Sequence, residues 1–78
     1  MDNNQDLNIK LSKDEALILF DFLSRFSEKE IEGVFQDQSE QKVLWIIEGQ
    51  LEKVLVEPFM PDYSEIILKA RDKIRDSE

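Results

Sequence analysis

The side chains of this chain that could do chemistry are mainly serine hydroxyls and carboxylates. Its 78 residues include no Cys, His or Thr, so the reactive thiol, the imidazole base and the usual zinc ligands are missing together. A nucleophilic serine needs a base beside it. Ser12, Ser27 and Ser39 are better explained as residues that hydrogen-bond to the starts of helices. We therefore predict a protein that is not an enzyme.

The carboxylates concentrate in one stretch of sequence. Glu28, Glu30 and Glu32 alternate along the chain, and Asp37 and Glu40 follow closely. Paired carboxylates can act as acid and base in a cleft that separates their pKa values, but so short a chain has little interior left once its core is filled. The stretch also lacks the length and glycine turn of a calcium loop, and no glycine-rich phosphate cradle is present. We expect a solvated acidic surface, with no metal and no cofactor.

The distribution of charge leaves two roles open for that surface, which are binding of a basic partner and an aid to solubility. There are 18 acidic and 10 basic residues, for a net charge of −8. Residues 28–40 hold five acids and one base, Lys29, and so carry −4 of that charge. Acidic surfaces favour basic partners, while apolar anchors carry more of the affinity. We expect Trp45 to pack in the core. Phe35 could either pack in the core or act as an apolar anchor for the partner. The predicted partner-binding residues are Glu28, Glu30, Glu32, Phe35, Asp37 and Glu40.

Basic residues gather near the C-terminus, where acids interrupt them. Nucleic-acid binding calls for a continuous basic face, whereas cations in the last turns of a helix are favoured by the helix dipole. We therefore predict no nucleic-acid site at these positions, which are Lys69, Arg71, Lys73 and Arg75.

Three segments have the pattern of amphipathic helices. The first follows a capping box at Ser12 and Glu15, and its apolar residues are numerous enough to meet either two neighbours or an outside partner. Similar boxes at Asp37 with Glu40, and at Asp62 with Glu65, predict the other two. The expected helices cover residues 13–27, 38–56 and 62–76, with Pro58 ending the second.

The connections are predicted less directly. Phe59 and Met60 lie between two prolines and are expected to fold the third helix back onto the second. Ser27 and Glu30 are expected to cap a short turn that Gly33 ends. Gly49 within the second helix indicates either close approach of another helix or simple tolerance.

Residues 1–78 are thus expected to form one all-α domain, a three-helix bundle with an extended lead-in over residues 1–11. Residues 7–11 alternate apolar and polar like a strand, yet no second strand is available to pair with it. An extended lead-in is our prediction, and strand exchange in a dimer is the alternative. The polar start from Met1 to Asp6 predicts no secretory signal. The longest apolar run, Ala16 to Phe20, is far below the ~20 residues of a membrane span. We expect a cytoplasmic protein that does not bind membranes.

Most of the chain, from Leu11 to Asp72, resembles small acidic bacterial proteins of the immunity or antitoxin type. The resemblance lies in the runs LSKDEALILFDFLSRF, DQSEQKVLWIIEGQLEKVLVEPF and DYSEIILKARD. It implies a protein that binds and blocks a toxic enzyme, often a basic one, although no family motif assigns binding residues here. The alternative is a structural homodimer formed through the broad apolar faces of the first two helices.

Overall fold

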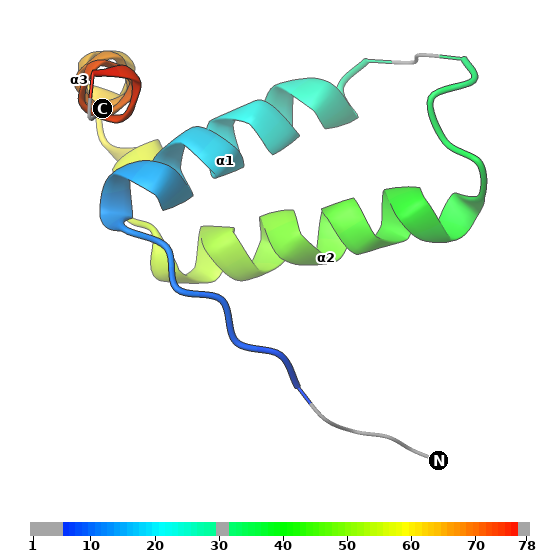
Figure 1. The fold of residues 1–78 in the computed structure, drawn as a ribbon. Helices are drawn as coiled ribbons and strands as arrows, with labels where there is room; N and C mark the ends of the chain where they lie inside the picture. Colours follow the sequence, from blue (N-terminus) through cyan, green and yellow to red (C-terminus); the bar gives the residue numbers. More distant parts are fainter. Residues whose placement is uncertain (1–5, 30–31, 77–78) are drawn as a thin grey trace.

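The structure, a computed structural model, describes residues 6–29 and 32–76. Within these residues the chain forms three α-helices, one short 3-10 helix and no strand. The elements are α1 (Lys13–Ser27), α2 (Gln38–Val54), η1 (Glu57–Phe59) and α3 (Tyr63–Arg75). α1 and α2 form an antiparallel hairpin, and α3 crosses the end at which α1 begins and α2 finishes (Figure 1). The all-α, three-helix fold predicted from the sequence is confirmed.

The start of α1 follows the predicted capping box. The backbone N–H of Ser12 donates to the Glu15 carboxylate at 2.8 Å, and the N–H of Glu15 donates to the Ser12 hydroxyl oxygen at 3.1 Å. Two amide groups without helical acceptors are satisfied in this way. The observed helix has the predicted bounds.

The start of α2 is capped differently from the prediction. Asp37 does cap the helix, since its carboxylate accepts from the N–H of Ser39 at 2.9 Å. Glu40 accepts instead from the N–H of Gln36, one residue before the cap, so the reciprocal box is not formed. The Ser39 side chain has no capping role in this arrangement, because its backbone amide is the group that is capped.

The end of α2 comes two residues earlier than predicted, at Val54. Pro58 has no N–H to donate to the carbonyl of Val54, and it disfavours helical geometry at Glu57. Leu55 is already extended, with φ −98° and ψ 131°. The chain then turns through η1 before α3.

The predicted capping box of α3 is absent. Asp62 stands at the N-cap, but its φ of −100° and ψ of 28° are not the extended values that a capping side chain needs, and its carboxylate makes no capping hydrogen bond. The residue belongs to the tight turn that follows Pro61. α3 itself is one residue shorter at each end than predicted.

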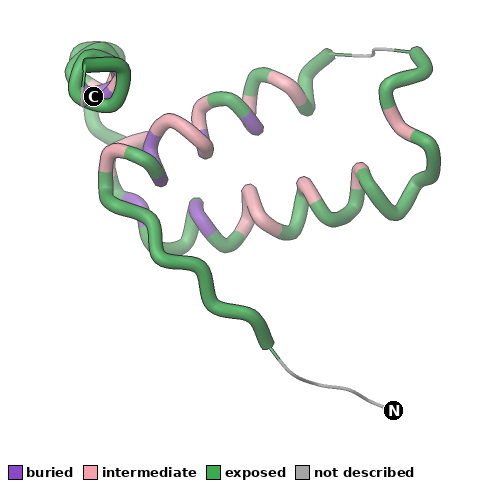
Figure 2. The backbone as a smooth tube through the Cα atoms, in the orientation of Figure 1, coloured by how far each residue is buried: buried purple, intermediate pink, exposed green. Residues whose placement is uncertain are grey.

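The core is small and lies where the three helices meet. α1 contributes half of the buried side chains, more than any other element, because it packs against both α2 and α3, one of the two outcomes that its excess of apolar residues predicted. Figure 2 shows the buried positions gathered near η1 and α3, with none at the far end of the hairpin. The buried side chains are Ala16, Leu17, Phe20, Leu23, Leu51, Leu55, Ile67 and Ala70.

The prediction that α3 folds back onto α2 is wrong. α3 packs on α1 and η1 and makes little contact with α2. Phe59 and Met60 do not act as an apolar clip, because they are 72% and 42% exposed. Val54, the last residue of α2, was expected in the apolar stripe of that helix. It is exposed as well, because α3 does not pack on that side of α2.

Polar contacts reinforce the end of the hairpin that α3 crosses. Lys13 Nζ lies 2.8 Å from the Glu57 carboxylate and joins α1 to η1. This hydrogen bond is the main reason that the pKa of Glu57 is lowered. On the other side of α1, Asp21 accepts from the Tyr63 hydroxyl at 3.2 Å and from Arg71 Nη2 at 2.8 Å. Both partners come from α3.

Gly49 is explained by tolerance and not by close packing. A Cβ placed there would meet nothing within 4 Å. Gly33, in contrast, has a φ of +78°, in the left-handed region where glycine is favoured. It lies in a turn, as predicted. Of the residues expected to cap that turn, Glu30 lies outside the described residues, and the Ser27 hydroxyl donates backward to the carbonyl of Ser24.

Candidate partner-binding surface

The far end of the α1–α2 hairpin has a small pocket of about 10 Å³, room for about one water molecule. It lies between the last turns of α1 and the first turns of α2, where the two helices diverge (Figure 1). We call this feature the hollow. Its walls come from the last turns of α1, the connection and the first turns of α2: Leu23, Phe26, Ser27, Lys29, Phe35, Gln41, Leu44, Trp45 and Glu48.

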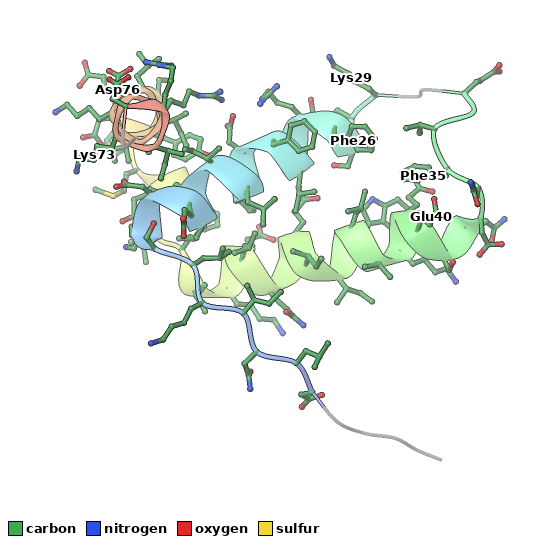
Figure 3. All side chains as sticks on the ribbon, in the orientation of Figure 1. Phe26, Lys29, Phe35, Glu40, Lys73 and Asp76 are labelled. Carbon is green, nitrogen blue, oxygen red and sulfur yellow. The ribbon has the colours of Figure 1, made fainter. Side chains whose placement is uncertain are left out.

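Two aromatic rings meet across the hollow. Phe35 from the connection packs edge-on against Phe26 from α1, with 5.8 Å between ring centroids and a 90° angle between planes. Figure 3 shows the two side chains facing each other at this end of the hairpin. Phe26 also stacks on Phe22 one turn earlier, at 5.7 Å. Phe35 is half-buried, so it holds the connection against α1 and still presents part of its ring.

Trp45 lies on the surface, contrary to the prediction that it packs in the core. It is 50% exposed and lines the hollow. The reason is its position on α2. Leu44, Leu51 and Leu55 follow one face at the spacing of successive helical turns, and Trp45 stands about 100° around the helix from Leu44. The indole is thus available at the surface that the sequence assigned to Phe35.

The predicted acidic residues divide into two groups. Glu28 and Glu32 are exposed, and no interaction of their side chains is described, whereas Glu30 lies outside the described residues. Asp37 and Glu40 hold the start of α2, as described above. The hydrogen bonds from Ser39 lower the pKa of Asp37. All four described carboxylates are exposed, and none of them lines the hollow itself.

Sequence reasoning missed two charged residues of this surface. Lys29 and Glu48 both line the hollow, and Glu48 accepts a hydrogen bond from the Ser27 hydroxyl at 3.4 Å. Glu48 is eight residues beyond the acidic stretch in sequence. Two full helical turns bring it back to the same face as Gln41 and Leu44. The helical periodicity of α2 was therefore the signal from which Glu48 could have been predicted as part of this surface.

A second polar cluster joins α1 to α3 and has a structural character. Asp21 is the shared acceptor of Arg25, Tyr63 and Arg71. Burial, followed by the charge and hydrogen bond of Asp21, raises the pKa of Tyr63 from 10.0 to about 12. Two of these three contacts link α1 to α3 and the third lies within α1, so the cluster stabilises the packing of α3 on α1.

The basic residues near the C-terminus are mostly paired. Arg71 pairs with Asp21, Lys73 lies 4.0 Å from Asp14, and Arg75 bonds to Asp72. Figure 3 places Lys73 at the opposite end of the molecule from Phe26 and Phe35. The two charged regions are therefore well separated.

Two searches of the described residues gave negative results. No group of three or more acidic side chains converges in a way that could hold a metal ion. None of the helices has the length and apolar character required to cross a membrane.

Comparisons with protein-family models, curated proteins and solved structures find no significant match to this chain.

Proposed function

We propose that this protein is a non-enzymatic binding protein that captures a basic protein partner at the hollow. The observation that supports the proposal is the juxtaposition of exposed aromatic surface and exposed carboxylates at one end of the hairpin. Trp45 and Phe35 supply apolar contact, and Glu28 and Glu32 surround it with negative charge.

The two kinds of group have separate roles in such a complex. Carboxylates at the rim raise the rate of encounter with a basic surface and orient it, and their effect is weakened by salt. Aromatic groups at the centre exclude water and hold the partner once it has docked. Trp is the residue type most enriched at such positions. The half-exposed indole beside the acidic connection fits this division.

Neutralisation of a toxic enzyme in the cytoplasm is the form of this activity that we favour. A basic enzyme that handles nucleic acid presents a positive site, and an acidic protein of 9.2 kDa seated on it blocks access by substrate. The absence of Cys, His and Thr from the chain supports a role in binding and not in catalysis.

The test is co-expression and titration with the product of the adjacent reading frame. Trp45 is the only tryptophan, so its emission reports occupancy of the hollow directly. We expect its spectrum to shift to shorter wavelength as the partner is added, and the titrated affinity to fall with rising salt. The double variant Glu28→Lys with Glu32→Lys should bind at least tenfold more weakly, because two attractions become repulsions.

A matched control separates local from overall charge. Glu65→Lys with Asp76→Lys makes the same change in net charge on and beside α3, away from the hollow. It should bind as the unmodified protein does. Equal weakening by both double variants would show that only total charge matters, and unchanged binding in the first variant would refute the proposed surface. Circular dichroism of both variants checks that the helices are retained.

A further inference from the structure

A second apolar surface lies between α1 and α3. Ile18, Leu19 and Phe22 of α1 form most of its floor, and Ile74 of α3 borders it. Phe22 is 48% exposed although it stacks on Phe26. We call this surface the groove. It uses a side of α1 that neither α2 nor α3 covers, so three large apolar side chains of the central helix remain partly open to water.

The ends of the groove differ in charge. Glu15 borders it near the start of α1, and Arg25 and Arg71 border it at the other end. Both guanidinium groups bond to the single carboxylate of Asp21. Two positive charges sharing one negative charge leave this end of the groove positive, and the Glu15 end carries a carboxylate.

The lead-in carries a matching set of groups. Residues 6–11, which we call the arm, have no helix or strand and extend away from the hairpin (Figure 1). Leu7 and Ile9 are 90% and 82% exposed, more than any other large apolar residue described. Side chains two residues apart in an extended chain point to the same side. Leu7, Ile9 and Leu11 therefore form one apolar edge, and Asp6, Asn8 and Lys10 form the opposite, polar edge.

The spacings of the arm and the groove agree. Leu7 and Ile9 are about 6.6 Å apart along an extended chain, and Ile18 and Phe22 are about 6 Å apart along a helix. Lys10 and Asp6 are separated by about 13 Å in the arm, and the ten residues from Glu15 to Arg25 span about 15 Å of α1. An arm running antiparallel to α1 thus sets Ile9 over Ile18 and Leu7 over Phe22. It also brings the Lys10 end of the arm to the Glu15 end of the groove and the Asp6 end to the Arg25 end, with both charges on the outer edge of the arm.

The arm cannot easily reach the groove of its own chain. To do so it would have to reverse direction at Leu11 and Ser12, where the sequence offers no Gly, Pro, Asn or Asp. Ser12 is held extended, with ψ at 166°, by its capping box. An arm from a second copy can enter the groove without a chain reversal and with Ser12 still extended. Each copy has one arm and one groove, so two copies related by a two-fold axis satisfy both exchanges and leave no site open for a third.

We propose that two copies of this chain dimerise by exchanging arms, with residues 6–11 of each copy docked in the groove formed by α1 and α3 of the other. This dimer is independent of partner capture. It uses the arm and the side of α1 that carries Ile18, and neither of these lines the hollow.

The first experiment measures mass across a dilution series by light scattering. The unmodified protein should approach twice 9.2 kDa as concentration rises. The variant Leu7→Asp with Ile9→Asp should remain a monomer, with the dimer dissociation constant raised at least about a hundredfold, because both docked edges lose their apolar contacts. Since the arm lies outside the helices, the helical content of this variant should equal that of the unmodified protein.

The control variant places the same charges on another exposed apolar surface. Ile46→Asp with Val54→Asp on α2 should dimerise normally. A monomeric unmodified protein at every concentration would overturn the proposal. So would a dimer that survives the arm substitutions, or one that is lost only in the α2 variant.

A disulfide test locates the docked arm. The chain has no cysteine, so single variants carry only the thiol that is introduced. Ile9→Cys, with an affinity tag, is mixed with untagged Ile18→Cys and oxidised. Mixed disulfide dimers should exceed those formed by Ile9→Cys with Ile46→Cys. Equal yields for the two mixtures would contradict docking in the groove. Efficient linkage within a single chain carrying both Ile9→Cys and Ile18→Cys, together with no mixed dimers, would place the arm in its own groove and also refute exchange.

Discussion

The two ends of the α1–α2 hairpin are built from the same pair of helices and serve different purposes. At the end crossed by α3, Leu17 and Leu55 are 2% and 3% exposed, and ion pairs tie α1 to η1 and α3. At the other end the helices enclose the hollow, and Trp45 is 50% exposed. Where a third element covers the hairpin, the apolar side chains form a core, and where none does they remain partly exposed to solvent.

The difference is set by the connections more than by the helices. The link from α2 to α3 is short, contains two prolines and carries α3 directly across α1. The link from α1 to α2 is longer, acidic, and contributes Phe35 as its one packed aromatic ring. A small protein of this kind has enough apolar residues for one well-covered end only.

The largest expected effect comes from truncating the covered end. Leu17→Ala should lower the free energy of unfolding by about 2–4 kcal/mol, because a fully buried leucine leaves a cavity among packed neighbours. Urea denaturation followed by circular dichroism measures it. Trp45→Ala is the control at the hollow and should cost less than about 1 kcal/mol. Similar losses for the two variants would mean that the ends do not differ in the way described.

A smaller effect is expected from the polar cluster beside the covered end. Asp21→Asn should cost about 1–2 kcal/mol, since the replaced carboxylate accepts three hydrogen bonds from partly exposed donors. It should also bring the pKa of Tyr63 down from about 12 toward 10.0, because it removes the nearby negative charge. Phenolate absorbance during a pH titration reports this pKa. No change in it would show that Asp21 does not act on Tyr63.

The same tyrosine predicts how stability depends on pH. The pKa of Tyr63 is higher in the folded state than the 10.0 of an unperturbed tyrosine. Its contribution to stability is therefore complete below pH 10 and is lost as the pH rises from 10 through about 12. This loss should shrink in the Asp21→Asn variant.

The smallest effect is expected between the two ends, at the middle of α2. Gly49→Ala should raise the free energy of unfolding by up to about 1 kcal/mol, because alanine favours the helix and no neighbour obstructs its Cβ. Thermal denaturation measures the gain. Destabilisation would indicate that another helix approaches Gly49 in solution, for instance across an interface between copies.

Local signals in the sequence predicted the helices well. Their caps, apolar spacing and proline stop depend on neighbouring residues, and the bounds of α1 were reproduced without error. Asp37 is extended and caps α2 as predicted, but its box is not completed because Glu40 accepts from Gln36 instead. The box at Asp62 fails because that N-cap is not extended, which the preceding turn decides.

Long-range features were harder to predict. The sequence does not determine whether α3 packs on α1 or on α2, because the apolar stripe of α3 could pack against either helix. Trp45 was assigned to the core because it is large and apolar, yet its position beside Leu44 turns it toward the hollow. The acidic surface was predicted as a group of residues, and the roles of Asp37 and Glu40 at the start of α2 appeared only in three dimensions.

The one-sided attachment of α3 has a consequence for how the molecule opens. Because α3 rests on α1 and η1 and barely touches α2, it can separate as a unit while the hairpin keeps its own contacts. Amide hydrogens of α3 should then exchange with solvent together, through an opening that leaves the α2 amides protected. Such stepwise opening would begin at the covered end of the hairpin and not at the end that holds the hollow.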